Sequence, residues 1–256
     1  MKRFIWAAAI MLVVGSVLPA AADFYVIGAG GNVGTKITSV PYTISSPGLY
    51  CLAKNLAYSP TTGNAITIEA DNVTLDLMGF TLSGPGKTSG NNKGIYVGVN
   101  SDSVEIRNGC VTGFGNRGIY AYGEEIRLIG LRVRDNGSLG ADLLGYYDQV
   151  LGCSFLNNGS AGVQTGINCL VKGNLAAGNG GSGITANSGS SLLDNACSDN
   201  GGYGLGAGSG CTVKGNTCQG NTEAGIYTAD HCLIINNASQ GITVGTGCTA
   251  VNNCKY

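Results

Sequence analysis

The residues best suited to binding or chemistry are tyrosines and polar residues that recur at one position of a repeat. The positions two residues after a repeated glycine hold Tyr96, Tyr120, Asp142 and Gln164, and Tyr122 lies two residues beyond Tyr120. A tyrosine ring can stack on the apolar C–H face of a sugar, while nearby amides and carboxylates bond its hydroxyls. We therefore expect these five residues to form a carbohydrate-binding surface, with Asp142 as its main polar contact. The alternative is that stacked tyrosines only stabilise neighbouring strands.

Cysteines are the second reactive set, and the chain has 10 of them. Cys197 with Cys218, and Cys211 with Cys232, occupy equivalent positions of consecutive repeats. Equivalent Cα atoms of stacked strands lie about 4.8 Å apart, so both pairs are candidate disulfides. In-register parallel strands do not aim their Cβ atoms at each other, so a buried stack of free thiols fits equally well. No Cys-x-x-Cys motif occurs, and we predict no metal site.

The elements that position these residues are short strands in a repeat. Glycines followed by an apolar or small residue recur at intervals of mostly 21 to 24 residues: Gly94, Gly118, Gly140, Gly162, Gly183, Gly204, Gly225 and Gly241. Apolar and polar residues alternate after each glycine, as in Ile184-Thr185-Ala186, which is the pattern of a half-buried strand. Turn-forming Gly and Asn residues separate these strands and leave no room for a helix.

Strands that repeat with the same side chains inward must stack on their own next copies. The repeat therefore predicts an all-β parallel solenoid over residues 64–256, with about eight or nine coils of about 21 or 22 residues. Asparagines recur in step with the glycines and predict hydrogen-bonded ladders of stacked amides. These expected columns are Asn136, Asn158, Asn179, Asn200 and Asn221, and Asn174, Asn195, Asn216 and Asn237.

Composition excludes several classes of protein. The chain has 256 residues and 44 glycines, without a three-residue period or much proline, so it is not collagen. Its hydrophobic fraction of 43% and net charge of −1 argue against a disordered chain. No basic block is present, so we expect no nucleic-acid partner.

The N-terminus reads as a secretory signal peptide over residues 1–22. Lys2 and Arg3 precede an apolar run, and Ala20-Ala21-Ala22 is a small-residue cleavage site. We therefore expect a secreted protein, extracellular or periplasmic, with no membrane association after cleavage. Residues 23–63 are expected to form a lead-in and cap, because the end strands of a solenoid need cover. The shortened last coil, from Gly241 onward, is expected to cap weakly and to be a surface for self-association.

Two longer stretches carry a resemblance to a known family. Residues 72–84 and 103–115, and the repeats after them, resemble the secreted bacterial right-handed parallel β-helix repeat proteins of the pectate-lyase-like superfamily. Residues 44–50 and 55–56 are similar to the lead-in segment of such proteins. The resemblance implies a right-handed, single-stranded β-helix. It leaves the function open, because the superfamily includes lyases, polygalacturonases, epimerases and proteins with no demonstrated activity.

Catalytic patterns of that superfamily do not transfer onto this chain. Polygalacturonase-like members use paired aspartates with a histidine, whereas this chain has no adjacent aspartates and only His231. Calcium-dependent lyase-like members use several acidic ligands with a basic residue. Asp142 and Asp148, with Arg127 and Lys172 on adjacent coils, are the nearest arrangement. No catalytic residue is therefore assigned.

Three hypotheses about function follow. The favoured one is a secreted module, without chemistry or cofactor, that binds a polysaccharide or cell-surface glycan or serves as a structural unit. The first alternative is a diverged polysaccharide lyase acting on uronic-acid polymers, with Arg127 and Lys172 as basic partners and calcium as cofactor. The second alternative is an adhesive or structural surface protein. The missing catalytic patterns argue against an enzyme, but the sequence does not decide this question.

Overall fold

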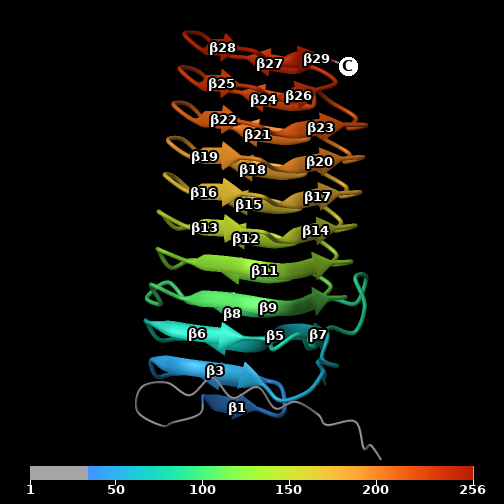
Figure 1. Cartoon of the computed structure of the whole chain (residues 1–256). Helices are drawn as coiled ribbons and strands as arrows, with labels where there is room; N and C mark the ends of the chain where they lie inside the picture. The colour runs from blue at the N-terminus through green and yellow to red at the C-terminus, as the bar shows by residue number, and fades with distance from the viewer. Residues whose placement is uncertain (1–33, 256) are drawn as a thin grey trace, which may run out of the picture. The chain divides into compact units, whose positions relative to one another are not determined.

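The chain winds into a parallel β-solenoid of about nine turns. The computed structural model describes residues 34–255, and every regular element in that range is a β-strand. Successive coils lie one on another, as the stacked arrows in Figure 1 show. The all-β, parallel solenoid architecture predicted from the repeat is thereby confirmed. The predicted signal peptide, residues 1–22, lies outside the described residues.

One flat side of the solenoid is a ten-stranded parallel sheet, here called sheet B. Its strands are β2 (Tyr42–Ile44), β5 (Thr62–Ile68), β8 (Asn91–Val97), β10 (Ile119–Ala121), β12 (Ala141–Leu143), β15 (Val163–Thr165), β18 (Ile184–Ala186), β21 (Leu205–Ala207), β24 (Ile226–Thr228) and β27 (Ile242–Val244). Equivalent repeat residues pair across neighbouring coils, so Ile184 lies beside Leu205 and Thr185 beside Gly206. Each position of the repeat therefore forms a column along the sheet.

The remaining strands form a 19-stranded parallel sheet, sheet A, which covers the other sides of each coil. Its strands are β1 (Thr35–Ile37), β3 (Gly48–Leu52), β4 (Leu56–Ala57), β6 (Val73–Asp76), β7 (Thr81–Ser83), β9 (Glu105–Thr112), β11 (Arg127–Arg134), β13 (Gln149–Leu151), β14 (Ser154–Leu156), β16 (Leu170–Lys172), β17 (Leu175–Ala177), β19 (Ser191–Leu193), β20 (Ala196–Ser198), β22 (Thr212–Lys214), β23 (Thr217–Gln219), β25 (Leu233–Ile235), β26 (Ala238–Ser239), β28 (Thr249–Val251) and β29 (Cys254–Lys255).

The described part of the expected lead-in already takes part in the coils. Strand β1 pairs in parallel with β3, and β2 pairs with β5 of sheet B. At the other end of the chain, Val244 and Val251 of the last coil are exposed. In residues 34–255, no helix has the length and apolar character needed to cross a membrane.

Close stacking explains the repeated glycine in the sheet B strands from β8 onward, whereas β2 and β5 have Pro41 and Ala65 at this position. A Cβ atom at Gly183 would lie 2.7 Å from the carbonyl oxygen of Gly204 and 2.8 Å from Nδ2 of Asn200. The equivalent glycines of the preceding coils face the same obstruction from the next coil. Gly241 belongs to the last coil and has nothing within 4 Å of that position. Contact between coils, rather than an unusual backbone angle, therefore selects these glycines.

Asparagine ladders join the coils inside the corners. Asn195 donates from Nδ2 to the carbonyl oxygen of Val171 at 2.9 Å and to Oδ1 of Asn216 at 3.0 Å. Its own Oδ1 accepts the backbone and side-chain N–H groups of Asn174, each at 3.0 Å. The same pattern links both predicted columns, which confirms the ladders. Buried amides thereby satisfy corner backbone groups that the sheets leave unpaired.

Several cysteines act as further members of such ladders. The Sγ of Cys153 accepts the backbone N–H of Leu131 at 3.5 Å, and the N–H of Cys153 donates to Oδ1 of Asn174 at 2.8 Å. Likewise the N–H of Cys211 donates to Sγ of Cys232 at 3.4 Å. These thiols fill small core positions and accept corner N–H groups, as an asparagine does elsewhere.

The candidate disulfide pairs are in register but unbonded. Cys197 and Cys218 are direct partners in the pairing of β20 with β23. Both of them, and Cys211 and Cys232 as well, are free thiols in the structure. Of the two arrangements that the spacing allowed, the structure therefore has the buried thiol stack. Burial raises the pKa of Cys211 to about 11, so that thiol stays protonated at neutral pH.

Candidate functional site

The predicted tyrosine face lies on the outer side of sheet B. Tyr96 pairs with Tyr120, Tyr120 with Asp142, and Asp142 with Gln164 across four adjoining strands. The residues on either side of Tyr96 and Tyr120 are fully buried, whereas the two rings are only partly buried. Alternation along short strands therefore places these side chains in one outward column, as the repeat predicted.

Three rings form a cluster at the start of this column. The ring centroids of Tyr96 and Tyr120 are 6.0 Å apart, those of Tyr96 and Tyr122 are 6.1 Å apart, and those of Tyr120 and Tyr122 are 4.7 Å apart. The hydroxyls of Tyr120 and Tyr122 share a hydrogen bond. Partial burial, and then this hydrogen bond, raise the pKa of Tyr120 to about 12. The phenol therefore remains a hydrogen-bond donor at neutral pH.

Asp142 corrects the prediction that it is the exposed polar contact of this face. It occupies the expected column, but only 3% of its surface is exposed. Nε of Arg117 donates to its Oδ2 at 2.7 Å, and its buried Oδ1 has no hydrogen-bond partner among the described residues. Arg117 reaches over the short side chain from the segment before β10 and covers it. Asp142 therefore forms an ion pair with Arg117 instead of offering a free carboxylate on the surface.

Two basic residues that the tyrosine pattern did not reveal complete the cluster. The guanidinium carbon of Arg117 lies 4.3 Å from the ring centroid of Tyr120, and Nζ of Lys93 lies 5.9 Å from it. A cation at this distance from an aromatic face is attracted to it. Lys93 and Arg117 both stand directly before a repeated glycine. The sequence feature that could have revealed them is a basic residue directly before the repeated glycine on both coils that carry a tyrosine in this column.

A second aromatic platform lies farther along this face, where Tyr227 belongs to the same outward column and Tyr203 precedes the repeated Gly204. The rings of Tyr203 and Tyr227 are stacked, with centroids 4.9 Å apart and planes 21° apart. Tyr227 lies beside Gly206 in the register of β24 with β21. It is five coils beyond Tyr120, or roughly 24 Å at about 4.8 Å per coil. Gln164, Thr185 and Gly206 occupy the column between the two platforms.

The grouping needed by the lyase hypothesis is not formed. Arg127 belongs to β11 and Lys172 to β16, both in sheet A, whereas Asp142 belongs to β12 in sheet B. Nη1 of Arg127 donates instead to Glu105 at 2.7 Å. The expectation that these basic residues accompany Asp142 is therefore wrong, because the corner of each coil turns them onto another side.

Asp148 is a core residue rather than a surface ligand. It is fully buried, and its Oδ1 accepts the backbone N–H of Ile126 at 2.9 Å. Its Oδ2 has no hydrogen-bond partner among residues 34–255. Burial raises its pKa to about 7. Across the same range, no group of three or more His, Cys, Asp or Glu residues is placed to hold a metal ion.

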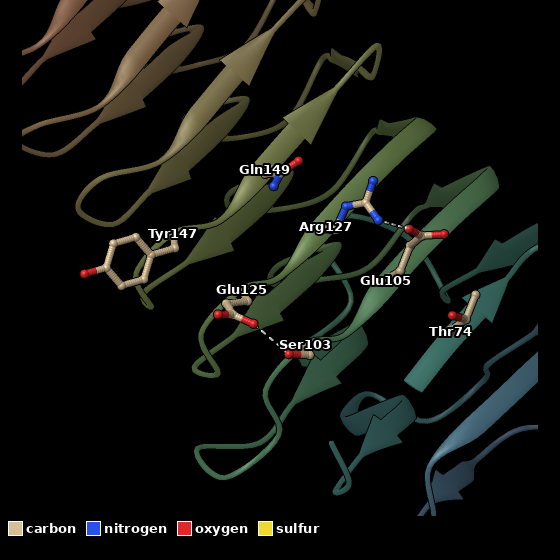
Figure 2. Close-up of a pocket in the computed structure, with 7 residues that line it drawn as sticks. All are labelled: Thr74, Ser103, Glu105, Glu125, Arg127, Tyr147 and Gln149. Carbon is tan, nitrogen blue, oxygen red and sulfur yellow. Dashed lines mark hydrogen bonds and ion pairs between the residues drawn. The ribbon is translucent and has the colours of Figure 1, made fainter. Parts of the chain in front are cut away.

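A polar pocket of about 420 Å³ opens over the first strands of sheet A and the corner before them. It is lined by Thr74, Ser103, Glu105, Glu125, Arg127, Tyr147 and Gln149. Figure 2 shows these side chains on adjoining coils, with Oγ of Ser103 donating to Glu125 at 2.8 Å. Only Arg127 among them was a sequence candidate. The other lining residues recur at intervals of about one repeat along the chain. Polar residues are common at the corners of the coils, so this spacing alone did not mark them as a site.

Solved structures with the same fold are distant in sequence. The A-module of the mannuronan C-5 epimerase AlgE4 from Azotobacter vinelandii is 16% identical, with a TM-score of 0.62 over 80% of this chain and 68% of that chain. The AlgE6 A-module from the same organism is 14% identical, with a TM-score of 0.54 over 87% and 91%. The ORF18 protein of Geobacillus virus E2 is 10% identical, with a TM-score of 0.60 over 89% and 54%. At these identities the likeness shows the fold alone.

Family membership rests on a direct sequence match. No curated protein matches the chain significantly. A family model described as "Right handed beta helix region" matches residues 64–212, which is more than half of the chain. This match agrees with the resemblance that the repeats carry and with the stacked parallel coils. The chain therefore belongs to the family of proteins with a right-handed β-helix region.

Proposed function

We propose that this protein is a secreted module that binds an acidic polysaccharide along the outer face of sheet B. The observation that carries the proposal is the cluster of Tyr96, Tyr120 and Tyr122 with Arg117 on its edge. Partly exposed rings offer stacking surfaces for the C–H face of a sugar. The phenol and guanidinium N–H groups beside them are donors for sugar hydroxyls and carboxylates.

The charge of the cluster favours an anionic glycan. Asp142 neutralises Arg117 through their ion pair. Lys93 has no ion-pair partner among the described residues and lies near Tyr120, so the cluster carries about one net positive charge. A uronate carboxylate would meet this charge at the edge of the stacked ring. A neutral polymer would leave the ammonium group without a counter-charge.

The second aromatic pair supports a polymer rather than a single sugar as ligand. Tyr203 and Tyr227 lie on the same outer face as Tyr120, several coils away. Between Tyr120 and Tyr227 the column holds Asp142, which Arg117 pairs with, then the uncharged Gln164 and the small Thr185 and Gly206. A polysaccharide running along the solenoid axis could rest on both platforms at once, and each contact would raise the effective concentration for the other.

Binding without chemistry is the simpler function for this site. A base that removes a proton next to a uronate carboxyl needs a pKa near the working pH. The pKa of Tyr120 is raised to about 12, so its hydroxyl is suited to donating a hydrogen bond instead.

Two of the structural neighbours are named as mannuronan C-5 epimerases, which supports a polysaccharide as the kind of ligand.

An affinity measurement on soluble polysaccharides tests this proposal. Alginate, polygalacturonate and neutral glucans would be titrated by calorimetry into the wild-type protein and into Tyr120→Ala, Tyr227→Ala and Tyr147→Asn. We expect an acidic polymer to bind, and each of the first two changes to weaken it about tenfold, since a stacked ring contributes about 1 kcal/mol or more. Tyr147 lies on the sheet A side, so its variant is the control for binding of the two acidic polymers.

Two results would count against the proposal. Wild-type affinity in Tyr120→Ala would show that this face does not bind the polymer. Release of an unsaturated uronate product during incubation, seen as ultraviolet absorbance, would instead establish a lyase.

A further inference from the structure

The corner between sheet B and sheet A has one position at which the backbone is left-handed in nine successive coils. Its residues are Asn72, Ser103, Glu125, Tyr147, Asn168, Gly189, Gly210, His231 and Gly247, with φ between 54° and 71°. Each of them before Gly247, which lies on the last coil, donates its backbone N–H to the carbonyl oxygen of the residue just before its counterpart in the next coil. Glycine and asparagine are the residues that adopt this conformation at least cost, and they hold five of the nine positions.

Four residues depart from this preference: His231 stands alone, whereas Ser103, Glu125 and Tyr147 lie on three consecutive coils. Ser103, Glu125 and Tyr147 adopt φ values of 56°, 57° and 62°. A side chain of this kind costs about 1 kcal/mol or more in the left-handed region relative to glycine. These three residues are neighbours along the corner, and all three line the polar pocket over sheet A. Costly backbone positions that gather at one pocket point to a function for their side chains.

The pocket presents both donors and acceptors that the protein itself leaves unused. One carboxylate oxygen of Glu125 accepts from Ser103, and the other has no partner among the described residues. Arg127 uses Nη1 for Glu105 and keeps its other N–H groups available. The amide of Gln149 makes no side-chain hydrogen bond in residues 34–255 and faces the same hollow (Figure 2).

An aromatic wall and the balance of charge narrow the ligand class. Tyr147 is 56% exposed and lies at one end of the row of lining residues, where its ring stands clear of the other side chains (Figure 2) and offers an open face for a ligand. Glu105 is paired with both Arg107, at 2.8 Å, and Arg127, at 2.7 Å, so the charges around the pocket balance and no net positive charge attracts a carboxylate-bearing ligand. Two adjacent hydroxyls of a sugar can both donate and accept hydrogen bonds. One can therefore donate to the carboxylate of Glu125 while the other accepts from the guanidinium of Arg127.

From this geometry we propose that the pocket between Tyr147 and Thr74 is a second glycan site, which binds a neutral sugar residue with adjacent hydroxyls. Glu125 accepts from one hydroxyl, Arg127 donates to the next, and the Tyr147 ring stacks on the sugar. The volume of about 420 Å³ has room for a sugar ring. The site is separate from the acidic-polysaccharide face of sheet B and does not depend on it.

Saturation-transfer NMR with neutral trisaccharides tests the proposal. Probes of gluco, galacto and manno configuration would be compared with trigalacturonate, on wild type and on Tyr147→Asn, Glu125→Gln and His231→Asn. Tyr147→Asn places at this corner the residue that the next coil has at Asn168, so the fold is kept, and its thermal midpoint checks this. His231→Asn makes a matched change in the same column, away from the pocket.

We expect at least one neutral trisaccharide to receive saturation from the wild-type protein. Tyr147→Asn and Glu125→Gln should each weaken that binding about tenfold, whereas His231→Asn and Tyr120→Ala should leave it unchanged. Wild-type affinity in a folded Tyr147→Asn variant, or preference of the pocket for trigalacturonate, would overturn the proposal. The absence of transfer from every neutral probe would overturn it too. Loss of alginate binding in Tyr120→Ala reports only on sheet B, so the two sites can fail independently.

Discussion

Asp148 makes the stability of the solenoid depend on pH in an unusual direction. Its carboxyl group is fully buried, accepts one backbone N–H from Ile126, and leaves Oδ2 unpaired. Burial raises its pKa from 3.8 to about 7. The folded chain therefore retains this proton over a range in which the unfolded chain has released it. Most carboxylates in ion pairs have the opposite effect.

The sign and size of the effect follow from the two pKa values of Asp148. Because its folded pKa is raised, the carboxyl group's contribution to stability is complete below the unfolded pKa of 3.8 and is lost as pH rises through about 7. Each pH unit in that window is worth about 1.4 kcal/mol. Between pH 5 and pH 8, the free energy of unfolding should fall by about 2 to 3 kcal/mol on account of this residue.

Urea unfolding at pH 5 and pH 8 measures this loss. Asp148→Asn keeps an oxygen that can accept the N–H of Ile126 but carries no charge, so its free energy of unfolding should lack that decline. Asp194→Asn changes an exposed carboxylate at another left-handed corner and is the control, which should keep the wild-type pH dependence. The same decline with pH in Asp148→Asn as in wild type would refute the reasoning, because the buried carboxyl would then not be its source.

Three further predictions concern the stacking of coils and the thiols. Gly183→Ala should lower the free energy of unfolding in urea by about 2 kcal/mol, because its Cβ would press on the next coil. Gly241→Ala, which has open space around it, should stay within about 0.5 kcal/mol of wild type. Equal losses in the two variants would contradict the steric explanation. Asn195→Ala should cost about 2 to 4 kcal/mol, since buried groups on both neighbouring coils lose their partners, and a loss below about 1 kcal/mol would argue against a structural ladder. In thiol alkylation followed by mass spectrometry, the exposed Cys254 should react in the native state and the buried cysteines only after unfolding without reductant; cysteines that stay unreactive without reductant would indicate disulfides.

The regular part of the fold was predictable because it repeats. Contact between coils forces glycine at positions such as Gly183, and corner amides must be satisfied at positions such as Asn195, so both leave a periodic trace in the sequence. The same periodicity correctly placed Tyr96, Tyr120 and Asp142 in one outward column. Period and alternation describe which way a side chain points, and that is why they succeeded here.

The parts that were missed depend on side chains that cross between columns. Alternation predicted that Asp142 points outward, but it could not reveal that Arg117 arches over it. Alternation also could not show that Arg127 and Asp142 lie on different sheets. The sequence pattern does not say how many residues each side of a coil contains, and therefore where the chain turns a corner. The pocket beside Tyr147 combines a corner with a strand, and only the three-dimensional stacking brings these together.

The central claim is that the tyrosine face of sheet B binds an acidic polysaccharide, and calorimetric titration of alginate into the wild-type protein and Tyr120→Ala tests it most directly. We expect saturable binding by the wild type and about tenfold weaker binding by the variant, at an unchanged thermal midpoint. Equal affinities for the two proteins, or binding confined to neutral glucans, would contradict it.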